Sequence, residues 1–280
     1  MKPSSKSPLR DSVRQEAEEL LRWMKQLDAV MGILMPTGSS VTVTGFAQED
    51  VTESFFLARR TFGSIYQLMD WTVRTTDTDR TENAAILVRR LLDLLARCHF
   101  IVGETDDQER RDQDLRAARR VLRDVKQHLT ALRAGLEIAD TAANFATTSE
   151  WEQAAADLES QIVADAGEAP NSHVSAEGEA KPPPNAHDIL KRVSLMHALH
   201  WRQLSDVFHG GLMGRAYQRR DLTFGVPAEP SRQDMVMHTA VLVMADLCRL
   251  WLTTMGERSE DFDDFALEFQ QFTGQQPDSP

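Results

Sequence analysis

The chain has 280 residues, of which 41% are hydrophobic, and it carries a formal net charge of −12 at pH 7. This hydrophobic content is enough to build a core, which excludes disorder along the whole chain. The negative charge repels phosphate backbones, so RNA is an allowed but unfavoured partner. Two cysteines, Cys98 and Cys248, each lie in an apolar run, which excludes a disulfide framework.

Apolar residues recur every three or four positions along much of the chain. This spacing predicts an all-α fold, an up-and-down helical bundle that forms a single helical domain over residues 1–280. The first three expected helices lie at about residues 10–35, 48–74 and 82–102. Between the first two, the sequence VTVTGF alternates like a strand but has no second strand to pair with, so we expect a loop or a minor hairpin.

The next expected helix, at about residues 108–140, has the most regular spacing, with Leu115, Leu122, Leu129 and Leu136 on one face. A coiled coil would also fit this pattern. A shorter helix at about 149–164 opens with the capping box SEWE. We expect a disordered loop around 164–185, because this segment lacks aromatic residues and aliphatic periodicity and ends in three prolines.

The last three expected helices lie at about residues 187–209, 233–255 and 259–272. The second of these is the most apolar part of the chain, but His238, Thr239, Asp246 and Arg249 interrupt it. We therefore expect a buried helix and no membrane association. The first 20 residues contain no apolar segment of a secretory signal, so the expected location is the cytoplasm.

The sequence HWRQLSDVFHGG, residues 200–211, contains the first candidate site. On a helix, Arg202, Ser205 and His209 lie on one side, beside the apolar stripe. Arg202 and His209 are about 10.5 Å apart along the axis, so only a bridging group such as a phosphate would join them. A structural role is the alternative, because His209 precedes two glycines at a helix end and Arg202 has Asp206 one turn away.

Arg90, Asp93 and Arg97 form the second candidate site, beside the apolar face of the 82–102 helix. A carboxylate between two guanidinium groups either fixes helix packing or presents the arginines to an anion. We expect Arg90 and Asp93 to form an anion pocket with Arg202, Ser205 and His209.

A basic face is expected on the 108–140 helix, where Arg116, Arg119, Arg120 and Arg123 lie opposite the leucine row. Such a face binds phosphates or an acidic partner helix, or it is only a solvated surface.

The sequence has no motif for a cofactor or a metal, so we expect neither. It contains no Glu-x-x-His pair, no Cys-x-x-Cys and no glycine-rich phosphate loop. His197 and His200 have a helical spacing that suits a metal but lack an obvious third ligand. Asp246 and Arg249 are expected to form a local ion pair.

The segments VRRLLDLLARCHF and WRQLSDVFHGG resemble a family of uncharacterised bacterial all-helical proteins. That family has an Arg-x-x-Leu/Phe-Glu/Asp helix and, far downstream, a Leu-Ser-x-x-x-His-Gly helix end. The resemblance covers about 40 residues, and Asp93 stands where a glutamate is expected. It implies an all-helical fold but no activity.

The spacing of Arg202 and His209 also resembles the Arg-x(4-6)-His motif of HEPN-domain proteins, which are all-helical ribonucleases and nucleotide-related modules. This resemblance implies a metal-independent ribonuclease of a toxin or phage-defence system. His209 would then be the general base or acid at the 2′-hydroxyl, and Arg202 would steady the phosphate. The leading expectation remains a protein that acts by binding or regulation, with a protein partner or self-association through helical faces.

Overall fold

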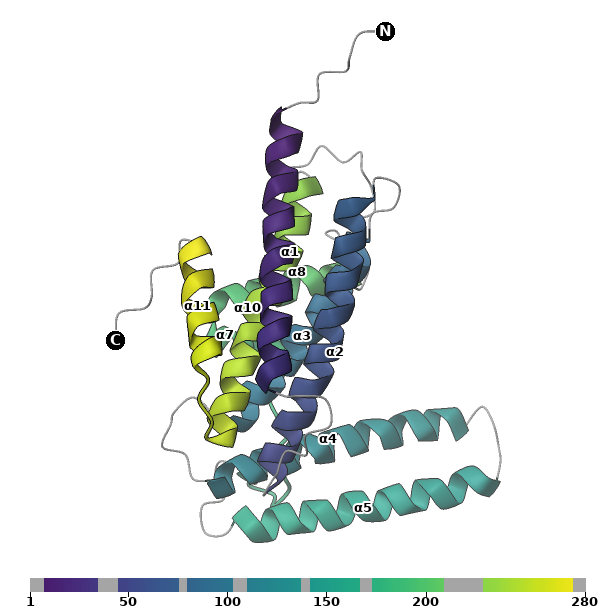
Figure 1. The fold of residues 1–280 in the computed structure, drawn as a ribbon. Helices are drawn as coiled ribbons and strands as arrows, with labels where there is room; N and C mark the ends of the chain where they lie inside the picture. The colour runs from purple at the N-terminus through teal and green to yellow at the C-terminus, as the bar shows by residue number, and fades with distance from the viewer. Residues whose placement is uncertain are drawn as a thin grey trace. The chain divides into compact units, whose positions relative to one another are not determined.

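The computed structural model describes residues 8–34, 45–75, 80–102, 110–136, 142–166, 173–208 and 229–273. In these residues the fold is all-α, as predicted, and no β-strand is present (Figure 1). The helices are α1 (Pro8–Leu34), α2 (Phe46–Arg74), α3 (Thr81–Val102), α4 (Arg110–Leu136), α5 (Ala142–Ala166), α7 (Ala186–Val193), α8 (Leu195–Phe208), α10 (Glu229–Met255) and α11 (Glu260–Thr273).

Several helix boundaries differ from the expected ones. α5 begins at Ala142, so Ser149 of the expected capping box lies inside the helix. The expected 187–209 helix is two helices, because Ser194 interrupts it and its Oγ accepts a hydrogen bond from the His197 N–H at 3.4 Å. Of the VTVTGF segment, residues 41–44 lie outside the described residues, and Phe46 begins α2.

The helices fall into two compact units, each described by itself here. The first unit comprises Met1–Thr42, Thr52–Cys98 and Ala186–Pro280, and the second comprises Val43–Val51 and His99–Asn185. The division falls inside α2 and α3. The apolar periodicity of the sequence does not change at this division. The expected single domain stays a prediction.

The first unit is a helical bundle in which α1 packs along α10 and against α11 (Figure 1). Aromatic contacts join these helices: Trp23 of α1 meets the ring edge of Phe269 of α11 at 5.4 Å between centroids. Phe55 of α2 stacks on Trp251 of α10 at 5.1 Å. The largest fully buried side chains include Phe55, Phe62, Phe262, Met24, Leu27, Met31, Ile65, Met69, Leu91, Leu92 and Leu95.

The apolar helix expected at 233–255 is confirmed as a buried helix of the first unit. Among the described helices, the segment Gln233–Met255 of α10 is the one long and apolar enough to cross a membrane, with a mean hydropathy of 1.5. However, 67% of its apolar window is buried inside the protein. Such burial is typical of the central helix of a bundle.

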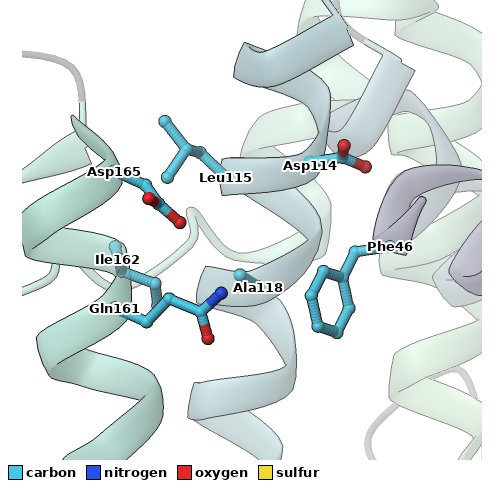
Figure 2. Close-up of a pocket in the computed structure, with 7 residues that line it drawn as sticks. All are labelled: Phe46, Asp114, Leu115, Ala118, Gln161, Ile162 and Asp165. Atoms are coloured by element: carbon cyan, nitrogen blue, oxygen red, sulfur yellow. The ribbon is translucent and has the colours of Figure 1, made fainter. Parts of the chain in front are cut away.

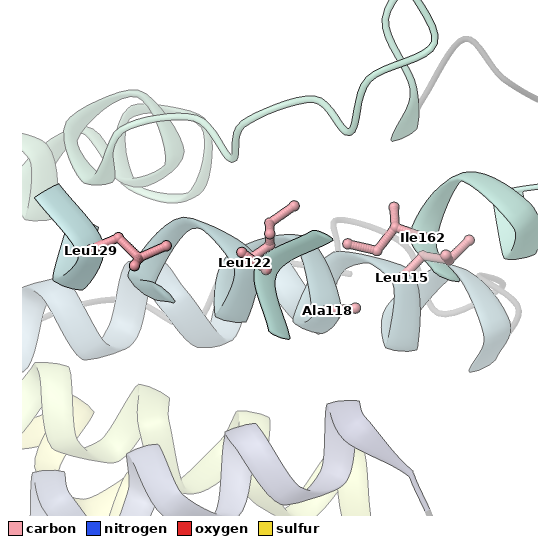
Figure 3. Packing of buried hydrophobic residues seen from close by; sticks show 6 residues of the cluster. Leu115, Ala118, Leu122, Leu129 and Ile162 are labelled. Carbon is pink, nitrogen blue, oxygen red and sulfur yellow. The ribbon is translucent and has the colours of Figure 1, made fainter. Parts of the chain in front are cut away.

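The second unit is built on α4 and α5, which run side by side (Figure 1). Near the start of α4 and the end of α5, a cavity of about 470 Å³ opens beside the first turn of α2 (Figure 2). Along the rest of the two helices, buried aliphatic side chains close the gap (Figure 3). Leu115, Leu122 and Leu129 of the predicted leucine row are all buried there.

The first residues of the expected loop around 164–185 are helical, because α5 extends to Ala166. Residues 167–172 lie outside the described residues. From 174 to 185 the chain is a loop, as expected, but it contains a tight turn in which Val174 and Ala180 form an isolated antiparallel bridge. Gly178 in this turn has a φ of 81°, which favours glycine.

Arg119 of α4 anchors this loop, which the composition of the segment did not predict. The Arg119 side chain is buried and donates from Nε to the Lys181 carbonyl at 2.7 Å and from Nη2 to the Pro182 carbonyl at 3.2 Å. Its Nη1 lies 3.1 Å from Nδ1 of His173, whose Nε2 contacts the Asp112 carboxylate. Both ring nitrogens of His173 therefore have partners within this unit.

Candidate functional site

α8 of the first unit is unusual because it buries a histidine beside Ala198 and Leu204 and leaves three aliphatic side chains exposed. Leu195, Met196 and Leu199 are 64%, 56% and 45% exposed. On the opposite side, His197 is only 5% exposed and His200 is half-buried. We call Leu195, Met196 and Leu199 the α8 outer face.

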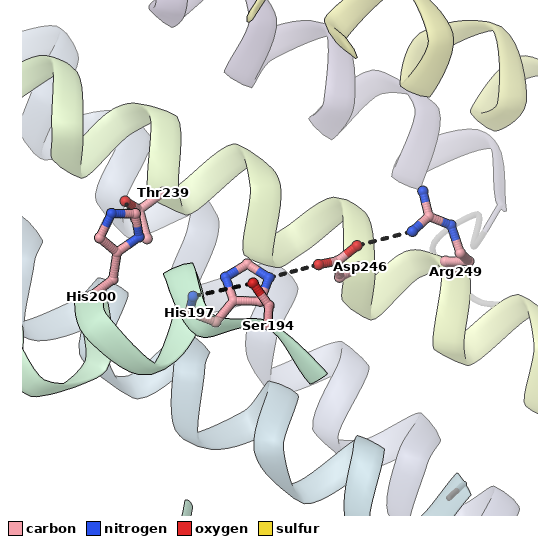
Figure 4. A network of polar contacts seen from close by, with 6 residues as sticks. All are labelled: Ser194, His197, His200, Thr239, Asp246 and Arg249. Carbon is pink, nitrogen blue, oxygen red and sulfur yellow. Dashed lines mark hydrogen bonds and ion pairs between the residues drawn. The ribbon is translucent and has the colours of Figure 1, made fainter. Parts of the chain in front are cut away.

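His197 is held inside the bundle by α10 (Figure 4). Its Nε2 lies 2.8 Å from Oδ2 of Asp246, whose Oδ1 accepts a hydrogen bond from Arg249 at 3.0 Å. The predicted pairing of Asp246 with Arg249 is therefore confirmed. Because an ionised carboxylate only accepts, we place the imidazole proton on Nε2. The other nitrogen, Nδ1, is buried and has no hydrogen-bond partner.

His200 also faces α10 (Figure 4). Its Nδ1 lies 3.2 Å from the Thr239 hydroxyl. Burial, with smaller contributions from His197 and His238, lowers the pKa of His200 from 6.5 to about 4. The ring is therefore neutral at pH 7. The two histidines with metal-like spacing thus find protein partners on α10, and the described residues contain no cluster of three or more metal-type side chains.

Trp201 connects α8 to α3. Its Nε1 donates a hydrogen bond to Oδ1 of Asp93 at 2.9 Å, and the Arg89 guanidinium lies 3.8 Å from the centroid of its ring. Arg89 also forms an ion pair with Asp93, while its buried Nε makes no hydrogen bond. Burial lowers the pKa of Arg89. His187 of α7 lies 5.6 Å from the Trp201 ring, so α3, α7 and α8 meet at this tryptophan.

Of the predicted site residues, Asp93 is the one with a described role in this arrangement. Arg90 and Arg202 are exposed, and Arg97 and Ser205 are half-buried. His209 lies outside the described residues, so its pairing with Arg202 and the anion pocket stay predictions.

Sequence reasoning missed Arg89, which is half-buried, and chose the neighbouring Arg90, which is exposed. Its spacing of four residues from Asp93 was the available signal. It also missed Trp201, whose indole N–H binds Asp93.

The prediction of a basic face on α4, in the second unit, is wrong. The four arginines do not form an exposed row that could bind phosphates. Arg119 is buried, as described above. Arg116 pairs with Asp112 at 3.1 Å, and Arg120 pairs with Asp50. Carboxylates of the same unit therefore neutralise much of this charge.

The comparisons with known proteins found no similar protein. The chain matches no protein-family model, no curated protein and no solved structure.

Proposed function

We propose that the protein is a helical binding protein that docks an amphipathic helix of a partner protein on the α8 outer face. The observation that carries this proposal is the exposure of Leu195, Met196 and Leu199 on a helix that buries His197. Clustered exposed aliphatic side chains are typical of interaction sites. Single exposed hydrophobic residues elsewhere on the chain carry no such weight.

The polar contacts beneath α8 support the same function. Asp246, Thr239 and Asp93 bind three inward side chains of α8, which fixes the rotation of the helix about its axis. A rotated helix would bury Leu195 and Leu199, but it would expose Leu204 and lose all three contacts. The contacts therefore keep the outer face presented to solvent, as preorganised binding requires.

The charges around the outer face favour an acidic partner. Lys191 and Arg192 in the last turn of α7, and Arg202 on α8, are exposed, against one exposed carboxylate, Asp188, among the side chains of these two helices that the structure describes. This local positive charge stands in a chain of net charge −12. A partner helix with acidic residues beside its apolar stripe would complement it, whereas a second copy of the same face would meet like charge.

The outer face alone supports moderate affinity. Full burial of a leucine or methionine stabilises by about 1.5–3 kcal/mol, and roughly half of each side chain is exposed, so the three contribute about 3 kcal/mol together. This corresponds to about a hundredfold in affinity. Flanking charges then add specificity and association rate.

Two synthetic helical peptides test the proposal by fluorescence anisotropy. They share one leucine stripe, flanked by glutamates in the first and by lysines in the second. The glutamate peptide is expected to bind the wild type and to bind Leu199→Asp at least about tenfold more weakly. Leu267→Asp is the matched control, because Leu267 is 50% exposed and lies on a different helix, α11.

Three results would contradict the proposal. The first is equal binding to Leu199→Asp and Leu267→Asp. The second is no preference for the glutamate peptide, or no binding of either peptide. The third is a wild-type dimer in sedimentation velocity that Leu199→Asp dissociates, which would make a second copy of the chain the occupant.

A further inference from the structure

Three histidines lie where α8 meets α10. His197 and His200 come from α8, and His238 comes from α10. His197 binds Asp246 of α10, and His200 lies beside the Thr239 hydroxyl of the same helix (Figure 4). A positive charge on His197 or His238 disfavours a charge on His200. The contact between the two helices is therefore weakened when His200 takes up a proton.

Burial opposes the same protonation. His200 is half-buried, and burial lowers its pKa from 6.5 to about 4. The His238 ring packs against Phe269 of α11 at 5.7 Å between centroids, and burial lowers the pKa of His238 as well. A released α8 would expose His200 to water, where its pKa returns toward 6.5. Protons therefore bind the released α8 more tightly than the docked one.

The other charged groups around the histidines already have partners. Asp246, which binds His197, also accepts a hydrogen bond from Arg249. On the α3 side, Asp93 pairs with Arg89 beside the α8 tryptophan. His187 of α7 packs against the same tryptophan and adds a further titratable ring. These pairs are formed without a charge on His200.

α8 is held by little apolar packing. Among its described side chains, the buried apolar ones are Ala198 and Leu204, and the α8 outer face is exposed. α10, in contrast, buries Met237, Val241 and Met244 completely. An element with few buried apolar contacts opens at a lower free energy than the rest of its domain. The polar contacts beneath α8 therefore carry much of its docking.

The contact between α1 and α10 has the opposite dependence on pH. Asp234 lies one turn before His238 on α10 and interacts with Glu16 of α1. Burial and the Glu16 carboxylate raise the pKa of Asp234 from 3.8 to about 6. Because this pKa is raised in the folded state, protonation of Asp234 stabilises the fold as the pH falls from 7 toward 4. Acid therefore loosens α8 while it favours the packing of α1 on α10.

We propose that acid releases α8 from α10 while α1 and α10 stay packed, so that the protein loses its docking site at low pH. The loss of docking rests on the proposed function of the α8 outer face. The release of α8 follows from the histidines alone and does not depend on what binds there.

Hydrogen exchange of the full chain at pH 7 and pH 5 tests the release, with each rate divided by the intrinsic rate of that amide at the same pH. Protection of the α8 amides is expected to fall at least about tenfold between pH 7 and pH 5, while protection of α10 is retained. His200→Gln keeps a polar group for the Thr239 hydroxyl but does not titrate, so it should remove most of the fall. His128→Gln is the matched control, because His128 is exposed on α4 of the second unit.

His238→Gln serves as a second variant if His200→Gln does not fold, and it should reduce the fall in part. Unchanged protection of α8 in the wild type, an equal fall in α10, or an equal reduction of the fall by His128→Gln would each overturn the proposal. Binding of the glutamate peptide at pH 7 separates this proposal from the docking function. A fall in α8 protection without peptide binding would refute docking alone, and peptide binding without the fall would refute the acid release alone.

Discussion

Replacing Asp246 with alanine tests how α8 is held in the bundle. His197 is 5% exposed, and its Nδ1 has no hydrogen-bond partner. Without Asp246, the Nε2 proton of the ring would be buried without an acceptor as well, which costs about 1–3 kcal/mol. The ion pair with Arg249 adds little, about 0–1 kcal/mol, because the Arg249 side chain is 55% exposed.

The measurement is urea unfolding, combined with hydrogen exchange of α8. Asp246→Ala is expected to lower the unfolding free energy of the first unit by about 1–3 kcal/mol and to speed exchange in α8. Arg249→Ala, the control, loses the exposed pair and leaves His197 bound, so its loss should stay below about 1 kcal/mol. Equal losses in the two variants, or unchanged exchange of α8 in Asp246→Ala, would refute the reasoning.

Three further predictions concern a glycine, a histidine and the ribonuclease alternative. Gly45→Ala should destabilise the protein by about 1–2 kcal/mol, because the new Cβ would meet a carboxylate at 2.9 Å. Gly63→Ala, inside α2, places its Cβ in open space and should stabilise the protein by about 0.5–1 kcal/mol. Thermal unfolding measures both changes. The pKa of His200 is lowered from 6.5 to about 4, so its contribution to stability is present above pH 6.5 and is lost as the pH falls toward 4. Between pH 6.5 and pH 4, the unfolding free energy of His200→Gln should therefore fall less than that of the wild type. The expected difference is about 1–2 kcal/mol after solvent screening, measured by urea titrations at each pH. Cells that express the wild type and His209→Ala should show the same growth and the same RNA profile; RNA degradation by the wild type alone would support the ribonuclease instead.

The helices were predictable because apolar periodicity reports which face of a helix is buried. Met24, Leu27 and Met31 of the first expected helix are all 0% exposed, and the leucine row of α4 is buried as well. On α8, His197 and Leu204 are also buried, and their spacing of seven residues places them on one face of the helix. Local spacing is sufficient for these features.

The polar contacts were less predictable, because they join residues far apart in the sequence. Arg119 was expected on a basic surface face. Its acceptor, the Lys181 carbonyl, lies 62 positions away, and no pattern in the sequence near Arg119 predicts this contact. Arg89 and Arg90 differ by only about 100° on a helix with a broad apolar face, so periodicity did not decide between them. The outward position of Leu199 requires knowing which helices cover α8.

The orientation of α8 is tested most directly by cysteine labelling at two adjacent positions. Leu199 is 45% exposed and Ala198 is 2% exposed. The two native thiols are buried, and burial raises the pKa of Cys248, so background labelling should be slow. Leu199→Cys is expected to react with a maleimide at the rate of an exposed thiol, and Ala198→Cys only as the fold opens. Protection of Leu199→Cys, or equal rates at the two positions, would contradict the account.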